Sequence, residues 1–314
     1  SGKIQVSTGS AVNGAGGDIA MAVGTGNTGN GGNVFVRAGE TTDDKSSGGN
    51  IALEGGMGSN TETHHGGIGG DISLAGGRAL GGDSVSDVGG DIFLTGGQAS
   101  TATGGSIALM SGYSDSTHSG ALSVGTDNSG FYGVSGPMSL STGNAMAGTS
   151  GLIELETGQG VGGAGGDISM TVGTGNTGNG GGVYTTAGES TFANAQGGNV
   201  SMTAGRGYGE GVTGGDIVMT AGEAIHESDN TVLGGSVFIE SGHSSGISSG
   251  DISLSFSDSG SSGVSGSLSM KSGKTTAGTS GLIELETGQG VGGAGGNVEV
   301  SVGAGDTGDG GEIK

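Results

Sequence analysis

The chain has 314 residues, of which 83 are glycine, one is proline and none is cysteine, and its formal net charge at pH 7 is −22. Because thirty Asp and Glu outnumber eight Lys and Arg, this charge excludes a nucleic-acid-binding protein and opposes docking on anionic lipid. Collagen is excluded because glycine does not recur at every third residue. No apolar run approaches the ~20 residues of a membrane span, so membrane insertion is not expected.

A short repeat runs through the whole chain. An apolar residue, here called the anchor, follows a glycine by two positions at twenty places, separated by nineteen gaps of 15 to 21 residues. The anchors are Ile4, Ile19, Val34, Ile51, Ile72, Ile92, Ile107, Leu122, Met138, Ile153, Ile168, Val183, Val200, Ile217, Val237, Ile252, Leu268, Ile283, Val298 and Ile313. Such regularity indicates one small unit stacked many times.

The residues after each anchor alternate in polarity. The second residue after the anchor is again apolar, as at Met21 and Leu53, and the residues between are mostly Ser, Thr, Ala or Glu, which is typical of a half-buried strand. The fifth is nearly always glycine, as at Gly39, where we expect positive φ or a tight corner. These patterns predict an all-β fold, a single parallel β-solenoid of about 19–20 coils, mostly 15 residues per coil, flattened around a thin Ile, Leu, Met and Val core.

A longer period lies above the coil. The phrase GTSGLIELETGQGVGGAGG occupies 148–166 and recurs letter for letter at 278–296, and 1–32 is a divergent copy of 150–181. We therefore predict one continuous β-solenoid over 1–314, made of long-period units 1–149, 150–279 and 280–314. The last is expected to be a truncated third unit of a longer protein.

Outward aromatic residues recur with this long period. Phe35 and Tyr184 occupy corresponding coils, as do Phe93 and Phe238. Aromatic residues spaced by the unit suggest an assembly surface for a neighbouring copy. The alternative is that the rings simply cover glycine-rich surface.

Stacked coils also predict two cross-coil ion pairs. The third residue after one anchor should lie above the third residue after the next, which brings Arg37 to Glu54 and Lys271 to Glu286. Exposed pairs contribute at most ~1 kcal/mol, so they would mark register more than they stabilise the fold.

Candidate metal ligands are few. Asp or Asn often precedes the anchor, and Asp71 and Asp91 occupy this position in consecutive coils, which suggests either a corner residue bonded to its own turn or a calcium ladder. Glu62, His64 and His65 lie in one long loop and are a second candidate metal site. No cofactor is expected, and calcium is the open alternative.

No enzyme is expected. The carboxylates of Glu154 and Glu156 point to one face of the predicted strand, but Glu284 and Glu286 repeat them, which indicates a repeated surface and not one cleft. No nucleophile–base pair, phosphate loop or cofactor fingerprint is present.

The repeated phrase carries a resemblance. GGDISLAGG at 69–77 and GGDIVMTAG at 214–222 resemble the glycine-rich β-solenoid repeats of secreted proteins of diatoms and other stramenopile algae. A second resemblance is to filamentous-haemagglutinin-type adhesins, whose GGxIxLxA phrase is looser. Both resemblances imply a long, extracellular, non-enzymatic protein.

These observations predict a structural protein. We expect a rigid extracellular fibre, filament, sheath or wall component, located outside the cell, at its surface or in its wall, whose copies associate with one another. The alternative is a cell-surface adhesin or a cation- or ligand-binding rod, with a polysaccharide or calcium as its partner.

Overall fold

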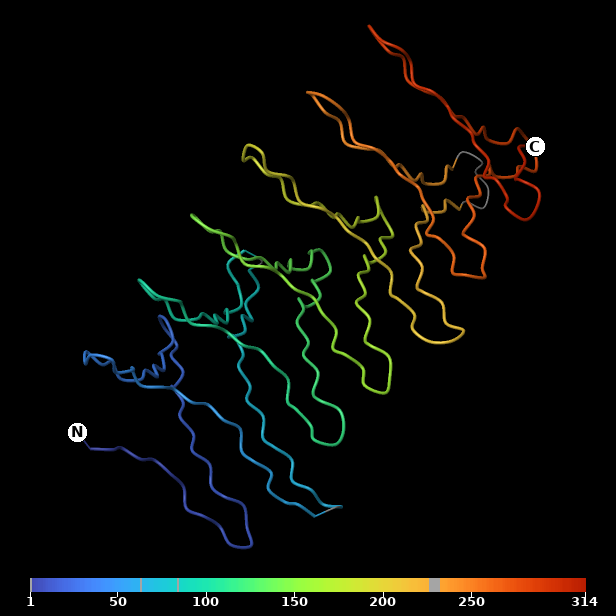
Figure 1. Ribbon diagram of the computed structural model, residues 1–314. Coiled ribbons are helices and arrows are strands. Elements are labelled where there is room, and N and C mark those ends of the chain that lie inside the picture. Colours follow the sequence, from blue (N-terminus) through green and yellow to red (C-terminus); the bar gives the residue numbers. More distant parts are fainter. Residues whose placement is uncertain (1, 63, 84, 226–231) are drawn as a thin grey trace. The chain divides into compact units, whose positions relative to one another are not determined.

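The chain is irregular throughout the part that the structure describes. The computed structural model describes residues 2–62, 64–83, 85–225 and 232–314, and these ranges contain no helix and no β-strand, only coil with short turns and bends. Figure 1 accordingly draws neither a coiled ribbon nor an arrow. The predicted all-β parallel β-solenoid is therefore wrong for the described residues, and the fold is coil-rich.

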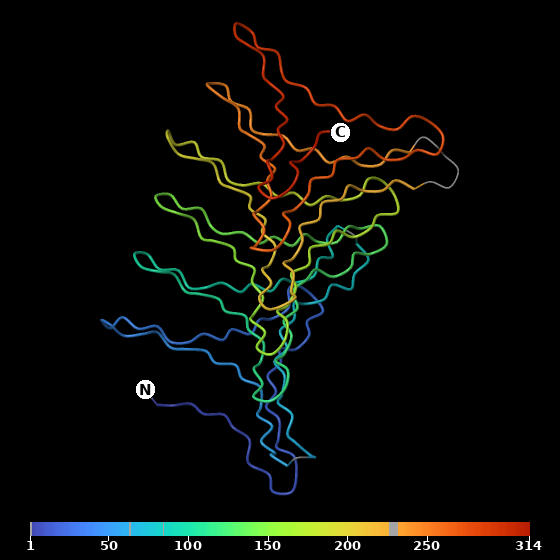
Figure 2. The same cartoon turned by 45° about the vertical axis from the view of Figure 1, so that its right-hand side comes forward.

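The chain divides into two units. The first is Ser1–Leu155 and the second is Glu156–Lys314, so the boundary falls inside the first copy of the repeated phrase. The long-period units 1–149, 150–279 and 280–314 stay a prediction, because a division of the chain into two units does not test a repeat of its sequence. Within each unit the chain runs out and back in a succession of loops (Figures 1 and 2).

Most loops are closed by one hydrogen bond between two glycines, here called the glycine clamp. The amide of the glycine two residues before an anchor donates to the carbonyl of the glycine five residues after the preceding anchor, at 2.8–3.3 Å. Ten clamps occur among the described residues: Gly39–Gly49, Gly56–Gly70, Gly77–Gly90, Gly97–Gly105, Gly112–Gly120, Gly188–Gly198, Gly205–Gly215, Gly222–Gly235, Gly242–Gly250 and Gly303–Gly311. The repeat therefore has a geometric meaning, since it fixes both ends of each loop.

Close approach of the backbone at some clamps favours the glycine that stands two residues before the anchor. A Cβ added to Gly90 would lie 3.0 Å from the amide nitrogen of Gly77. A Cβ added to Gly105 would lie 2.9 Å from the amide nitrogen of Gly97. Where the residue four positions after the preceding anchor has a larger side chain than alanine, the added Cβ would meet that side chain. A Cβ on Gly32, for example, would lie 2.7 Å from the Val23 side chain. At Gly90 and Gly105 a larger residue would therefore require the neighbouring backbone to shift, whereas at Gly120 and Gly215 the added Cβ would lie at an ordinary contact distance of 3.5 Å.

The most sheltered residues line these clamps and are not the predicted core. Every described residue is exposed except a few half-buried ones, and most of those stand four residues after an anchor. The half-buried residues at this position are Ala38, Gly76, Gly96, Thr157, Ala187, Ala204, Ala221 and Ser241. The anchors are instead turned to solvent, since Ile153 is 50% exposed and its alternating partner Leu155 is 68% exposed.

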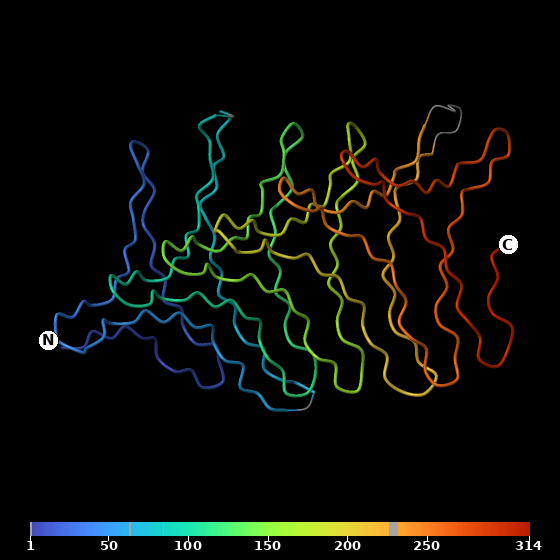
Figure 3. The same cartoon turned by 45° about the horizontal axis from the view of Figure 1, so that its top comes forward.

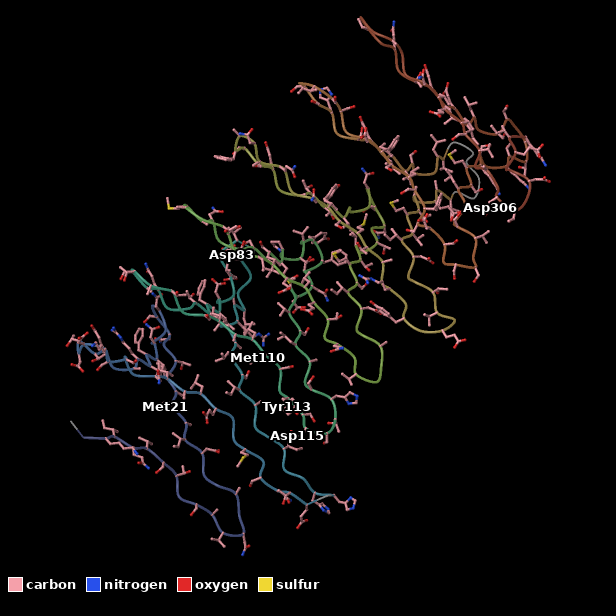
Figure 4. The ribbon with its side chains drawn as sticks, viewed as in Figure 1. Met21, Asp83, Met110, Tyr113, Asp115 and Asp306 are labelled. Atoms are coloured by element: carbon pink, nitrogen blue, oxygen red, sulfur yellow. The ribbon has the colours of Figure 1, made fainter. Side chains whose placement is uncertain are left out.

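The exposed surface gives the same result on a larger scale. The accessible area is 31222 Å² for 29.3 kDa, whereas a compact chain of this mass would expose about 11,500 Å² and an unfolded one about 42,000 Å². Figure 3 shows the open loops of the backbone. Figure 4 adds the side chains, and two of those it labels, Met21 and Met110, are exposed. The predicted thin core of Ile, Leu, Met and Val is absent from the described residues.

The hydrogen-bond pattern explains why no strand forms. A strand needs consecutive bonds between two segments, but each clamp is an isolated bond joining the two ends of a single loop. Successive coils are not joined by a ladder in the described ranges, and glycine makes ordering the backbone costly. The expected corner geometry also differs: positive φ occurs near loop tips, as at Gly162 (φ 80) and Gly292 (φ 77), and not at the clamp glycine Gly39.

Candidate functional site

The candidate functional surface is the set of exposed apolar anchors and loops, because the described residues form no pocket. The described ranges also contain no helix of sufficient length and apolarity to cross a membrane. The residues that the sequence predicts to be functional lie on this open surface.

The predicted metal loop is organised by an asparagine. The side-chain oxygen of Asn60 accepts a hydrogen bond from the amide of Glu62 at 3.0 Å, and its side-chain amide donates to the carbonyl of His65. The Asn60 carbonyl accepts from the amide of Gly67 at 3.0 Å, and the His65 amide donates to the Glu62 carbonyl at 3.3 Å. These bonds hold the backbone, while Glu62, His64 and His65 remain exposed.

No metal centre is assembled in the described part of the chain. No group of three His, Cys, Asp or Glu side chains there is placed to hold one ion. Asp71 and Asp91 each stand before an anchor, at the entrance to separate segments, and both are exposed. The structure thus does not bring the candidate ligands of either predicted site together as a set.

The four predicted assembly aromatics lie on the surface. Phe35, Phe93, Tyr184 and Phe238 are all exposed, but nearly every side chain is exposed, so exposure does not distinguish them. A Cβ added to Gly182 would lie 2.9 Å from the ring of Tyr184, so this ring passes close to one glycine while it stays 91% exposed. The assembly surface and the alternative, in which the rings cover glycine-rich surface, both stay predictions.

The predicted ion pairs do not form in the structure. Among the described residues the one pair within 4 Å is Lys314 with Glu312 at 3.2 Å, whereas neither Arg37 with Glu54 nor Lys271 with Glu286 is paired. The prediction assumed that consecutive coils stack residue on residue. Without ladders between coils, that register is absent.

A carboxylate that the sequence analysis did not single out, that of Asp83, is held by two hydrogen bonds. The Asp83 carboxylate accepts hydrogen bonds from the Ser86 hydroxyl at 2.5 Å and from the Val85 amide at 3.0 Å. These bonds, that of the Ser86 side chain foremost, lower the pKa of Asp83 below its ordinary value. The Asp87 carboxylate in turn accepts from the Asp83 amide at 2.8 Å. An Asp followed by Ser three residues later was the available signal for this turn.

Three loops share a different closure, and we call them the Thr-closed loops: 8–17, 157–166 and 287–296. In each, the threonine hydroxyl donates to the carbonyl of the glycine before the next anchor, at 3.1 Å for all three loops. The tip valine is almost fully exposed, 90% at Val12 and 93% at both Val161 and Val291. The residue after the valine has positive φ each time, 60 at Asn13, 80 at Gly162 and 77 at Gly292.

Comparison with known proteins gives no relative from which a function can be transferred. No family model matches the chain, and no curated protein and no solved structure is similar to it. The functional argument therefore rests on the residues and geometry of this chain alone.

Proposed function

We propose that the protein is a structural component of an extracellular filament, sheath or wall, in which copies of the chain associate and cover each other's apolar anchors. It acts without catalysis. Its partner is a further copy of itself, and its place is outside the cell, at the cell surface or in the wall.

The observation that carries this proposal is the uncovered apolar surface. The chain exposes 31222 Å², about 20,000 Å² more than a compact protein of its mass. Burial of apolar surface contributes roughly 25 cal/mol per Å², so leaving the anchors in water forgoes the main stabilising term of a folded protein. Contact with another molecule that covers the anchors recovers this stabilisation.

The sequence repeat favours further copies of the same chain as the partner that covers the anchors. A stable interface of ordinary size buries about 1,200–2,000 Å² in total, a small part of the excess. A partner that covers anchors recurring every 15 to 21 residues must present a matching repeat, and this chain does so. Copies placed side by side satisfy both conditions, and repetition lets the contact extend.

The proposal is tested by following assembly of the 1–314 chain with concentration. Sedimentation velocity should show large species that grow with protein concentration, and electron microscopy of the same samples should show filaments or sheets of repeated copies. Hydrogen exchange should slow at the anchors on assembly. Single chains that remain monodisperse at every concentration would overturn the proposal.

The adhesin or cation-binding rod stays the alternative prediction, and no described feature favours it over a structural role. Imaging of the native assembly separates the two. Many copies of the chain in an ordered filament favour the structural role, whereas a lone stalk with a bound glycan or calcium favours the alternative.

A further inference from the structure

The Thr-closed loops present one local surface three times on one chain. Their tip valines Val12, Val161 and Val291 correspond in sequence, each begins a short bend, and each loop has the same hydroxyl-to-carbonyl closure. In each loop the residue that follows the valine has positive φ. This residue is asparagine in the first loop and glycine in the other two. Asparagine tolerates this conformation better than most residues, so the first loop keeps the backbone conformation of the other two although it has asparagine in place of glycine.

These loops are also free of charge. The segments 8–17, 157–166 and 287–296 contain no Asp, Glu, Lys, Arg or His, in a chain of net charge −22. Two chains that repel each other overall can therefore approach at these loops with little electrostatic cost. Each loop offers an apolar tip at the point of approach, because the valine is not covered by any neighbouring segment.

We infer that the three Thr-closed loops are equivalent docking sites for a second copy of this chain, with Val12, Val161 and Val291 as the side chains that contact it. The inference rests on the proposed self-association and specifies where it occurs. Since a surface that accepts one of these loops accepts the other two, each chain offers several equivalent contacts. Association then propagates from copy to copy instead of stopping at a closed pair.

A second copy fits this surface better than an unrelated protein. A partner that occupies all three loops has to offer the same acceptor surface repeatedly, and the excess exposed area is far larger than one ordinary partner covers. Because the loops carry no charge, two acidic copies that meet at them repel each other less than copies that meet at charged segments.

The test compares two triple variants of the 1–314 chain by sedimentation velocity. The first carries Val12→Asp, Val161→Asp and Val291→Asp. The second, the matched control, carries Val134→Asp, Ile247→Asp and Val264→Asp, which change the charge equally at residues 93%, 99% and 97% exposed in other loops. We expect the first variant to need at least about tenfold more protein to assemble, and the control to assemble close to wild type.

A crosslinking experiment identifies the partner surface. The chain has no cysteine, so Val161→Cys or Val291→Cys gives a single attachment point for a photoreactive maleimide. Each labelled chain is mixed with isotopically heavy wild-type chain, and crosslinked peptides are mapped by mass spectrometry. We expect both positions to crosslink to the same heavy peptides.

Two outcomes overturn the inference while leaving self-association standing. In one, wild type assembles and both triple variants are equally impaired or equally unaffected. In the other, the two probes react with different partner peptides, or with none while assembly proceeds. Failure of wild type itself to assemble would instead contradict the proposed function, so the two failures are distinguishable.

Discussion

At the scale of single residues, Asp83 shows how this chain orders itself without a core. Its carboxylate receives the Ser86 hydroxyl and the Val85 amide, and both bonds favour the charged form. The pKa is lowered because of these bonds, although the side chain is open to water. Short polar side chains bonded to their own turn thus do locally what packing does in an ordinary domain.

The first prediction concerns the pH dependence of this turn. Because the folded-state pKa of Asp83 lies below its unfolded value, the turn is favoured above about pH 3.9 and loses this contribution as pH falls through the folded pKa. Carbon-13 NMR titration of the carboxyl groups should show a lowered pKa for Asp83. In Ser86→Ala the pKa should move back up toward the ordinary value, because the largest cause is removed. An unchanged Asp83 titration in this variant would contradict the assignment.

At the scale of elements, the glycine clamp replaces the strand as the unit of the fold. The sequence repeat contains both glycines that form each clamp, as Gly77 and Gly90 do. Their role was misjudged, since alternation of apolar and polar residues resembles a half-buried strand whether or not a ladder forms. Alternation cannot report hydrogen bonding between coils, which depends on how segments distant in sequence approach.

A prediction at this scale uses two adjacent glycines. A Cβ on Gly76 would collide with the carbonyl of Gly90, whereas a Cβ on Gly77 meets nothing within 4 Å. Gly76→Ala should therefore open the clamp in which the Gly90 amide donates to the Gly77 carbonyl at 2.8 Å. Since a hydrogen bond contributes about 1 kcal/mol net, exchange of the Gly90 amide should accelerate roughly fivefold.

Gly77→Ala is the matched control for this experiment. Both substitutions reduce the freedom of the unfolded chain equally, so any difference between them reflects the clamp itself. Equal exchange rates at the Gly90 amide in the two variants would contradict the clamp as the determinant of loop closure.

At the scale of the whole molecule, composition limits what the sequence could reveal. The repeat and the acidic charge are visible in the sequence, but whether the anchors Ile153 and Leu155 meet each other or solvent is not. The Arg37–Glu54 pair failed for the same reason, because it required coil-on-coil register. A chain with 83 glycines and small side chains has little apolar volume with which to impose one arrangement by itself.

The last prediction follows from the net charge of −22. Copies that associate must bring these charges together, so at pH 7 assembly should increase with NaCl as the Debye length falls from about 30 Å at 0.01 M to about 3 Å at 1 M. Light scattering across a salt series at fixed protein concentration measures this. The same series near pH 4.1, the isoelectric point, is the control, since the repulsion is then already absent.

The sign of the salt effect discriminates between two kinds of interface. If ion pairs such as Lys271 with Glu286 joined the copies, salt would weaken assembly at pH 7. If uncharged contacts such as the Val161 and Val291 tips join them, salt strengthens assembly at pH 7 and has little effect near pH 4.1. Because eight basic residues are too few to neutralise thirty acidic ones, contacts at uncharged segments such as the Thr-closed loops meet the least repulsion between copies.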